Sequence, residues 1–303
     1  MRILHGPHDY GGAGYKISRA QRKLGHQSDY GSFQTSYFGF PAEYNLQEYR
    51  SRFKKASFFL KAVLKYDIFH FHSESLFFDY RDIPLFKKLG KKVIFHFHGS
   101  EIRGKKMHPR IKLADAHLVS TPDLLEYVPD GIWIPQPIDL DYWKPLSIEK
   151  KEGAVIIIHA PSHRKKKGTD LIISTIEELK REGYPVELSL IEGKSYESLK
   201  SYYQKGGIFM DQIIIGTYGN FAVEGMALKK PVCVYIKEEV SPLYPKELPV
   251  MNTSLDNLKQ NLIKLIEDEN LRKELGEKGR AYVEKYHDVQ KVALKCLSIY
   301  RNC

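Results

Sequence analysis

Short apolar runs alternate along this chain with longer stretches in which apolar positions recur every three or four residues. The runs predict strands and the longer stretches predict helices. Alternation of the two favours a parallel sheet covered by helices on both faces. In the first half we expect strands at Arg2–His5, Ile68–His72, Val93–His98, His117–Ser120 and Ile132–Ile134, and helices at Tyr15–Leu24, Leu46–Lys65 and Phe78–Leu89.

The second half repeats the pattern after a proline-containing stretch. Residues 135–150 contain three prolines and little periodicity, which is typical of an interdomain linker. Beyond it we expect strands at Ala154–Ala160, Val186–Ile191, Gln212–Ile215 and Val232–Ile236, and helices over 168–182, 195–204, 221–229, 255–268, 270–286 and Val289–Tyr300. The pattern predicts an α/β protein of two Rossmann-like domains facing a cleft, with ligands at the carboxyl ends of the strands.

Length and composition agree with two globular domains. The chain has 303 residues, of which 42% are hydrophobic and 28% charged. Its net charge of +10 favours an acidic partner such as a nucleotide, a polyanion or an anionic membrane. No nucleic-acid-binding motif is present, so we expect no nucleic acid partner. Three cysteines without metal-type spacing favour a reducing cytoplasm, and we expect neither a signal peptide nor a membrane-spanning segment.

The most informative segment is 211–232, DQIIIGTYGNFAVEGMALKKPV. An apolar run at Ile213–Ile215 predicts a strand, and a tight loop at Gly216–Asn220 leads to a helix from Phe221 to Leu228. The unpaired backbone N–H groups at the start of such a helix bind anions, and the helix dipole favours negative charge. Glu224 is expected in the first turn, within reach of sugar hydroxyls beside a bound diphosphate. An ordinary strand–turn–helix connection is the alternative.

Two further segments place polar or cationic groups at strand ends. Gly11, Gly12 and Gly14 follow the first strand, where a glycine turn lets a ligand approach the backbone closely; a plain turn is the alternative. Their spacing differs from the dinucleotide pattern G-x-G-x-x-G, which disfavours a nicotinamide or flavin site. Arg164–Lys167 places four cations after another strand, and we expect one or two of them to bind phosphate while the others are solvated.

Histidines end two neighbouring strands as the pairs His70/His72 and His96/His98. Residues two apart on a strand share a face, so four histidines could cluster as a zinc site. Simple hydrogen bonding in a buried sheet explains them better, because no other ligand has metal-type spacing. We therefore expect no metal. His98 lies before Gly99, where the chain turns outward, and is a candidate contact to a sugar or phosphate.

Basic and apolar residues are interleaved in residues 49–66, YRSRFKKASFFLKAVLKY. Such a helix either packs its apolar side on the sheet or lies on an anionic membrane. The packing interpretation is favoured. Asp139 and Asp141 form a D-x-D triplet, which holds a metal in some sugar transferases. Its place among prolines favours a turn.

Taken in order, these segments resemble a retaining glycosyltransferase of the GT-B fold, in the large family-4 group, and the resemblance covers nearly the whole chain. GGAG resembles the glycine loop near the donor diphosphate, which implies donor contacts at Gly11 and Gly12. HFHG resembles the family's H-x-H-G stretch, which implies that His98 contacts the transferred sugar. KGTDLII resembles K-G-x-D-L-L-I and implies that Lys167 binds phosphate.

The segment 211–232 resembles the family's E-x7-E region. Glu224 matches the second Glu, which implies a contact to the donor ribose, whereas Gly216 stands where the first Glu is expected. Gln136–Asp139 replaces the usual Asn-Gly-Val-Asp. Arg164 substitutes for an arginine that the family has near Ser162. The final helix resembles one that crosses back onto the first domain.

The sequence thus predicts an N-terminal acceptor-binding domain over 1–145 plus 289–303, and a C-terminal nucleotide-sugar-binding domain over 146–288. The predicted enzyme is a metal-independent retaining hexosyltransferase that needs no cofactor. Its donor is a nucleotide diphosphate sugar, and a UDP-sugar is the favoured prediction. The acceptor is a hydroxyl group, on a glycan or lipid-linked. A bacterial cell-envelope role at the inner membrane face is expected. His98 and Glu224 are the candidate catalytic residues. The donor-binding candidates are Gly11, Gly12, Arg164, Lys167, Gly219, Asn220, Phe221, Ala222 and Glu224.

Two other functions fit the same sequence. One is a nucleotide-sugar epimerase of the same fold, which would need an acid/base pair. The other is a non-catalytic nucleotide- or glycan-binding protein, which Gly216 favours because a usual sugar contact is missing there.

Overall fold

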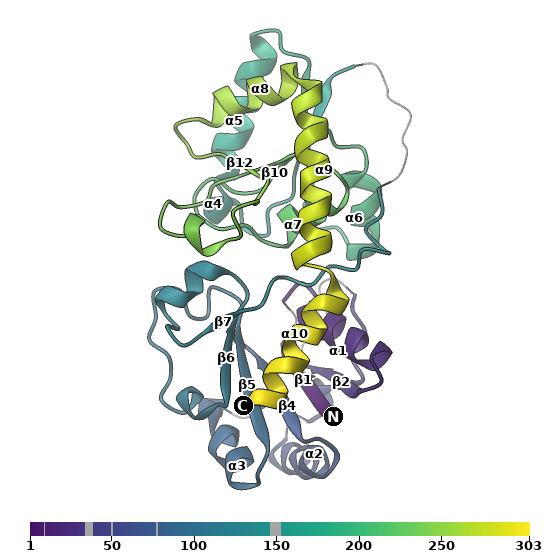
Figure 1. The fold of residues 1–303 in the computed structure, drawn as a ribbon, viewed down its shortest axis with the longest axis vertical. Helices are drawn as coiled ribbons and strands as arrows, with labels where there is room; N and C mark the ends of the chain where they lie inside the picture. The colour runs from purple at the N-terminus through teal and green to yellow at the C-terminus, as the bar shows by residue number, and fades with distance from the viewer. Residues whose placement is uncertain (9, 34–38, 50, 77, 146–152) are drawn as a thin grey trace. The chain divides into compact units, whose positions relative to one another are not determined.

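A computed structural model describes residues 1–8, 10–33, 39–49, 51–76, 78–145 and 153–303. The chain divides into two compact units. The first unit comprises Met1–Pro137 and Val289–Cys303, and the second comprises Ile138–Asp288. Both are α/β, and every strand pair in the described residues is parallel (Figure 1). The predicted α/β fold class is confirmed.

The first unit holds a seven-stranded sheet in the order β3-β2-β1-β4-β5-β6-β7. Its strands are β1 Arg2–Gly6, β2 Gln27–Ser32, β3 Tyr44–Asn45, β4 Ile68–His72, β5 Lys92–Phe97, β6 Ala116–Val119 and β7 Ile132–Trp133. Its helices are α1 Ala13–Lys23, α2 Arg52–Lys65, α3 Asp82–Lys88 and α10 Val289–Asn302, with short 3-10 turns at Leu46–Tyr49, Phe78–Tyr80, Ile111–Leu113 and Pro122–Glu126.

Alternation along the central strands separates two apolar layers in the first unit. Phe69 and Phe95 point to one face and pack with Phe58 of α2 and Phe86 of α3. Ile3, Ile68, Ile94 and Leu118 point to the other face and pack with Ile17 of α1 and Val292, Leu297 and Tyr300 of α10. The last helix of the chain is therefore part of the first unit, as the resemblance implied.

The second unit holds a five-stranded sheet in the order β12-β11-β10-β8-β9. The strands are β8 Val155–His159, β9 Val186–Leu190, β10 Ile208–Met210, β11 Val232–Val234 and β12 Met251–Asn252. The helices are α4 Arg164–Lys167, α5 Thr169–Arg181, α6 Tyr196–Tyr203, α7 Asn220–Ala227, α8 Leu258–Glu267 and α9 Glu269–Tyr286, with a 3-10 turn at Ser241–Leu243.

The first unit ends at Pro137, earlier than the expected position 145. The reason is the packing of Trp143, which is fully buried and donates a hydrogen bond of 2.7 Å to the Tyr196 hydroxyl. Asp139 accepts hydrogen bonds from the backbone of Asp141 and Tyr142 at 3.0 and 3.1 Å, so the D-x-D triplet is a turn. The expected boundary at 145/146 adjoins residues 146–152, which lie outside the described residues.

Candidate functional site

The loop before α7 is organised by one side chain, Gln212. Its Oε1 accepts from the backbone N–H groups of Ile214 and Ile215 at 2.8 and 2.6 Å, and its Nε2 donates to the carbonyls of Thr217 and Tyr235 at 2.8 Å each. Residues 213–215 are therefore a bend, and the predicted strand there is wrong. The strand is β10, which pairs Ile208 with Ile157 of β8.

Gly216 has a backbone conformation that a glutamate would adopt only with strain. Its φ is +88°, and a Cβ atom there would lie 2.2 Å from Cγ of Lys237. Glycine at position 216, where the E-x7-E pattern has its first Glu, therefore agrees with the backbone conformation of this loop, which a glutamate would adopt only with strain.

Helix α7 begins at Asn220, one residue earlier than predicted, with Gly219 as its N-cap. Gly219 has no side chain to cap the helix, so the first N–H groups, at Asn220, Phe221 and Ala222, belong to the set that a helix leaves without intrahelical partners. Glu224 begins the second turn rather than lying in the first, and it is 7% exposed. Its charge raises the pKa of Tyr196 and Tyr203, although burial of these tyrosines is the larger cause.

The side chain of Phe221 packs against other aromatic rings of the second unit. Its ring stacks on Phe209 at 4.9 Å and meets Tyr203 edge-on at 5.3 Å. Ala222 is fully buried. For these two candidates only the backbone N–H group is suited to contact a ligand, which is the contact that the sequence predicted.

Lys167 and Arg164 both have carboxylate partners within the second unit. Lys167, whose side chain is 12% exposed, pairs with Asp211, which is 1% exposed. Asp211 also accepts from the backbone N–H of Gly219 at 3.3 Å, so it links the basic segment to the start of α7. Arg164 pairs with Glu192 at the surface, where the side chains are 49% and 38% exposed. The structure thus brings Lys167, Gly219 and Asn220 together. Asp211 is the member of this group that the sequence argument missed.

In the first unit, Gly11 and Gly12 form a turn before α1. Their φ angles are +62° and +75°, and a Cβ atom on Gly12 would lie 2.3 Å from the Phe40 ring. Lys16 donates to the Gly11 carbonyl at 2.9 Å. Glycine is required here for backbone geometry. Donor contact at Gly11 and Gly12 stays a prediction.

His98 ends the run that begins with β5, and both of its ring nitrogens have partners. Nε2 lies 2.9 Å from Nδ1 of His72, and Nδ1 lies 2.7 Å from the Ser120 hydroxyl. Tyr10 stacks on one face of the ring at 4.7 Å with an angle of 6°. Burial lowers the pKa of His98 to about 4, so the imidazole is uncharged at neutral pH.

Glu101 is a second residue that the sequence argument missed, although HGSE places it three residues after His98. Its Oε1 accepts from the N–H groups of His98 and Gly99 and from the Ser73 hydroxyl. Its Oε2 is buried and has no hydrogen-bond partner among the described residues. A carboxylate held this way at the end of a strand is suited to accept a hydrogen bond from a ligand.

Two groups of three histidines are close enough to be considered for a metal: His5, His70 and His72, and His72, His96 and His98, each with nitrogens within 4.8 Å. A ligating nitrogen directs its lone pair in the ring plane. The rings of His70 and His72 are stacked at 4.5 Å and 13°, and those of His96 and His98 at 4.4 Å and 29°. Stacked rings direct their lone pairs along separate planes, so this arrangement does not fit a shared ion.

No protein-family model matches the chain. It is 33% identical over 103 residues to an uncharacterized glycosyltransferase, MJ1178, of Methanocaldococcus jannaschii. That match covers 33% of this chain and 29% of the relative. The structure resembles sucrose-phosphate synthase from Thermosynechococcus elongatus, with a TM-score of 0.71, 14% identity and coverage of 99% and 98% of the two chains. It also resembles Anabaena HepE in complex with UDP-glucose, with a TM-score of 0.70, 13% identity and full coverage of both.

The fold is of the GT-B type. At these identities the structural likeness shows the architecture alone, and two parallel-sheet α/β units of the GT-B type are what the sequence predicted.

Proposed function

We propose that the protein is a retaining hexosyltransferase that moves a sugar from a UDP-sugar to a hydroxyl acceptor without a metal ion. The observation that carries the proposal is the group formed by Lys167, Asp211 and the Gly219–Asn220 helix start in the second unit, with Glu224 one turn further along α7. It matches the donor-binding positions implied by the resemblance. The relative that matches 103 residues of this chain is described as an uncharacterized glycosyltransferase, and the structure of a protein of the same fold has been solved in complex with UDP-glucose.

In the proposed reaction the donor's glycosidic bond to the diphosphate breaks, a bond to the acceptor oxygen forms, and the proton of the acceptor hydroxyl passes to the leaving diphosphate. Negative charge grows on the leaving diphosphate. The N–H groups of Asn220, Phe221 and Ala222 and the ammonium group of Lys167 stabilise that charge, and Arg164 is a further diphosphate ligand. Glu224 binds the ribose, Gly11 and Gly12 approach the diphosphate, and His98 lies against the transferred sugar. The first unit binds the acceptor, and the Glu101 carboxylate is its proposed hydrogen-bond partner.

The reaction is tested by incubating the protein with UDP-glucose and measuring UDP release in excess EDTA. Because fixed cations and backbone dipoles are proposed to stabilise the leaving diphosphate in place of a metal ion, we expect EDTA to leave the rate of UDP release unchanged within about twofold. Loss of activity in EDTA, restored by Mg²⁺ or Mn²⁺, would contradict metal independence. Conversion of UDP-glucose to an epimer would replace the proposal with the epimerase alternative, and binding of UDP without turnover would indicate a binding protein.

The nucleotide contact is tested by Glu224→Gln. Loss of the carboxylate is expected to weaken UDP binding about 10- to 100-fold, because a hydrogen bond to a charged group contributes about 1.5–3 kcal/mol. Isothermal calorimetry gives the Kd. The exposed Glu197→Gln in α6 is the matched control and should bind as the unmodified protein does. Equal affinity of all three proteins would refute the ribose contact.

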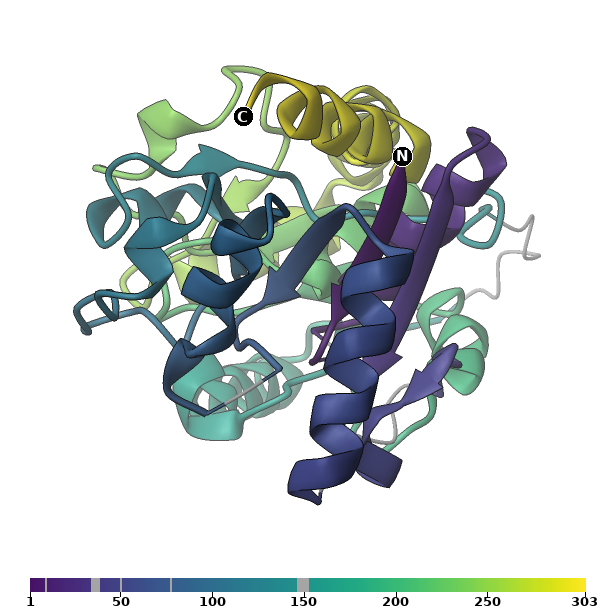
Figure 2. The same ribbon diagram turned by 90° about the horizontal axis from the view of Figure 1, so that it is seen from below.

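We propose further that the first unit contacts an anionic membrane surface through α2. Phe58 and Ala62 of this helix are buried against the sheet, whereas Phe53, Leu60 and Leu64 are 90%, 61% and 71% exposed and lie along one stripe (Figure 2 shows α2 at the front). Residues 52–65 contain five cations and no acidic residue. An apolar stripe beside cations fits anionic lipid.

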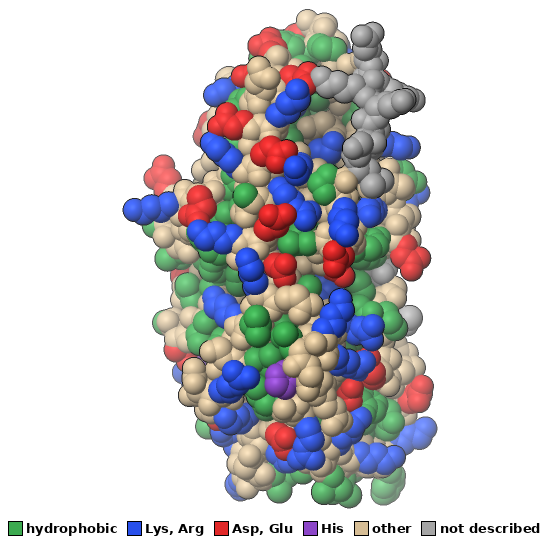
Figure 3. Space-filling model, turned by 45° about the vertical axis from the view of Figure 1, so that its right-hand side comes forward, with side chains coloured by type: hydrophobic (Ala, Val, Ile, Leu, Met, Phe, Trp, Pro, Cys, Tyr) green, Lys and Arg blue, Asp and Glu red, His purple; other side chains and the backbone are tan. Residues whose placement is uncertain are grey.

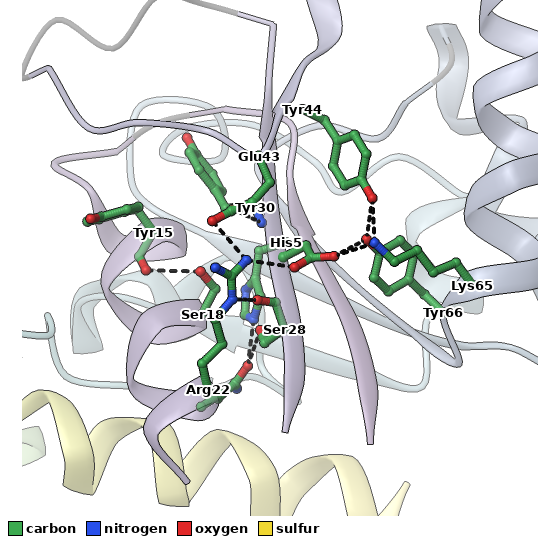
Figure 4. Close-up of polar contacts among 12 residues, drawn as sticks. His5, Tyr15, Ser18, Arg22, Ser28, Tyr30, Glu43, Tyr44, Lys65 and Tyr66 are labelled. Atoms are coloured by element: carbon green, nitrogen blue, oxygen red, sulfur yellow. Dashed lines mark hydrogen bonds and ion pairs between the residues drawn. The ribbon is translucent and has the colours of Figure 1, made fainter. Parts of the chain in front are cut away.

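Two of these cations are engaged elsewhere. Lys65 points toward Tyr44 and Tyr66 (Figure 4) and pairs with Asp29 at 2.8 Å. Lys55 lies over the Phe33 ring at 5.8 Å, so the lipid-facing charge falls to Arg52, Lys54 and Lys61. On the face of the molecule in Figure 3, cations are interspersed with acidic side chains, so net charge alone does not define such a surface. Among the described residues no helix is long and apolar enough to cross a membrane.

Vesicle flotation tests the membrane contact. The protein is expected to float with vesicles rich in phosphatidylglycerol and to bind phosphatidylcholine vesicles at least about tenfold more weakly. Changing Phe53, Leu60 and Leu64 together to serine should abolish flotation, since each apolar side chain contributes about 1.5–3 kcal/mol when buried. Leu255→Ser, which alters a leucine that is 54% exposed in the second unit, is the control. If the triple variant floats to the same extent as the unmodified protein, α2 is not the membrane-contacting helix.

A further inference from the structure

Five histidines lie together on one face of the first unit's sheet, beneath α1 and α10. They continue the apolar row of Ile3, Ile68, Ile94 and Leu118 toward the carboxyl ends of the strands, because residues two apart share a face. The members are His5 on β1, His70 and His72 on β4, and His96 and His98 at the end of β5; His5, His70, His72 and His96 are at most 1% exposed.

The five rings form a continuous set of hydrogen bonds with three other side chains. One row runs from Gln21 Oε1 to His5 (2.9 Å), from His5 to His72 (3.3 Å), from His72 to His98 (2.9 Å) and from His98 to Ser120 (2.7 Å). The second row returns from Ser120 to His96 (3.2 Å), from His96 to His70 (3.2 Å), from His70 to the Tyr300 hydroxyl (2.5 Å) and from Tyr300 to Gln21 Nε2 (3.4 Å). The eight side chains therefore form a closed ring, hereafter the histidine ring.

Each link in the histidine ring holds one proton, and this fixes how the protons are arranged. An uncharged imidazole donates from one nitrogen and accepts at the other, and a hydroxyl group likewise does both. Gln21 Oε1 only accepts, so the nitrogen facing it, His5 Nε2, carries the proton. His5 Nδ1 must then accept from His72 Nε2, and the same step repeats around the ring. All five histidines are Nε2–H tautomers, Ser120 donates to His98, and Tyr300 donates to His70.

The arrangement is all-or-none. Turning the Gln21 amide over would reverse every link at once and place all five protons on Nδ1. A mixture of tautomers would leave two donors or two acceptors facing each other in a buried site, which costs about 1–3 kcal/mol. Ser28 donates to the same Gln21 oxygen at 2.8 Å, which supports the orientation with Oε1 toward His5 (His5 and Ser28 are labelled in Figure 4).

We propose that the histidine ring positions His98, with Gln21, Ser120 and Tyr300 as positioning residues that hold it uncharged, in one shared tautomer and in one orientation. The inference rests on the proposed function in taking His98 as the residue beside the sugar. It also refines that role. Both nitrogens of His98 are occupied, and its ring stacks with Tyr10 at 4.7 Å and with His96 at 4.4 Å, so its nitrogens are not the atoms that bind the ligand.

Charge around the ring agrees with this assignment. Among the described residues, Glu101 is the carboxylate that acts on His98, and its effect on the His98 pKa is smaller than that of burial. On the α10 side, Tyr300 and Cys296 face the ring. Burial raises the pKa of both, so they are uncharged as well.

The experiment is ¹⁵N–¹H correlation of histidine side chains in the intact protein at pH 7.5, without ligand. We expect five uncharged histidines, all with the Nε2–H pattern. Ser120→Ala should move the resonances of His96 and His98 together, because Ser120 is the link between them. Ser18→Ala removes a buried hydroxyl that bonds to the Tyr15 carbonyl outside the ring, and should move neither. Ser120→Thr keeps the hydroxyl and should leave both resonances in place; if the alanine variant does not fold, the tautomers of the unmodified protein decide.

Mixed tautomers, a charged member at pH 7.5, or a shift at His96 without one at His98 would overturn the ring. A separate measurement tests its role: Ser120→Ala should lower kcat for UDP release about tenfold with the Kd for UDP unchanged, and an unchanged kcat would overturn positioning. Addition of UDP-glucose should leave the resonances of the two His98 nitrogens unchanged. A change in their chemical shifts would show that these nitrogens bind the sugar. Absence of UDP binding by the unmodified protein would refute the proposed function while leaving the resonances to decide on the ring.

Discussion

The first unit is expected to lose stability steeply as the pH falls from about 6.5 toward 4, because its five ring histidines are uncharged when folded. Burial lowers the pKa of His5 and His98 to about 4, and lowers the pKa of His70, His72 and His96 well below the ordinary value of 6.5. Between these values the unfolded chain binds protons that the folded unit does not. The stabilisation is thus complete above pH 6.5 and is lost as the pH falls.

The size of the effect follows from the number of groups. Each such histidine contributes a slope of about 1.4 kcal/mol per pH unit, and five titrating in one window give a slope several times steeper. Urea unfolding at pH 7.5, 6 and 5 measures it. The two tryptophans separate the units, since Trp133 lies in the first and Trp143 in the second. Trp143→Phe leaves a fluorescence signal from the first unit, and Trp133→Phe leaves one from the second. Equal pH slopes for the two units would contradict the prediction.

The histidines show which part of this structure the sequence could predict. Alternation of Phe with Ile and His in IFHFH and VIFHFH correctly predicted β4 and β5, and showed that the histidines share a face. Their partners come from other elements of the chain: Gln21 lies in α1 and Tyr300 in α10. Nothing local in either helix predicts that its polar side chain faces a histidine on a strand of the sheet. The ring therefore required the tertiary structure.

The wrong strand at Ile213–Ile215 has a similar cause. The run is apolar and followed by glycine, which is the local pattern of a buried strand. Its backbone N–H groups are taken by the Gln212 side chain, and the sheet position goes to Ile208–Met210 after two glycines. Strand β2, Gln27–Ser32, was missed because its sequence QSDYGS is polar, although it pairs with β1 along four residues. In both cases pairing in the sheet overrode local propensity.

The candidate donor site was predicted in part. The positions of Lys167, Gly219 and Glu224 follow from matching short segments in order, and the structure brings Lys167 and Gly219 to one carboxylate. That carboxylate, Asp211, was unremarkable in sequence because a single aspartate after a strand has many roles. Its contacts to Lys167 and Gly219 depend on the pairing of β10 with β8, which brings the end of β10 beside the segment after β8.

Replacing Asp211 by alanine is expected to lower the free energy of unfolding of the second unit by about 3–5 kcal/mol, because it leaves the ammonium group of Lys167 buried without its partner. The backbone N–H of Gly219 also loses its acceptor. Urea unfolding of the Trp133→Phe protein measures the change. Glu192→Ala removes the partner of the exposed Arg164 and is the matched control, with little expected change because solvent screens an exposed ion pair. A similar small change for both variants would show that burial of the Lys167–Asp211 pair has no energetic consequence.

A double variant, Lys167→Met with Asp211→Leu, separates stability from ligand binding. Removing both charges and filling their space with apolar atoms should recover most of the lost stability, since an apolar pair of similar volume is often as stable as a buried ion pair. If Lys167 binds the diphosphate as proposed, this variant folds but binds UDP about 10- to 100-fold more weakly, the loss expected for a charge-assisted contact. If Lys167 serves only to neutralise Asp211, the variant binds UDP like the unmodified protein. Calorimetry on this one stable variant therefore decides whether the ion pair beside α7 is part of the donor site or part of the scaffold.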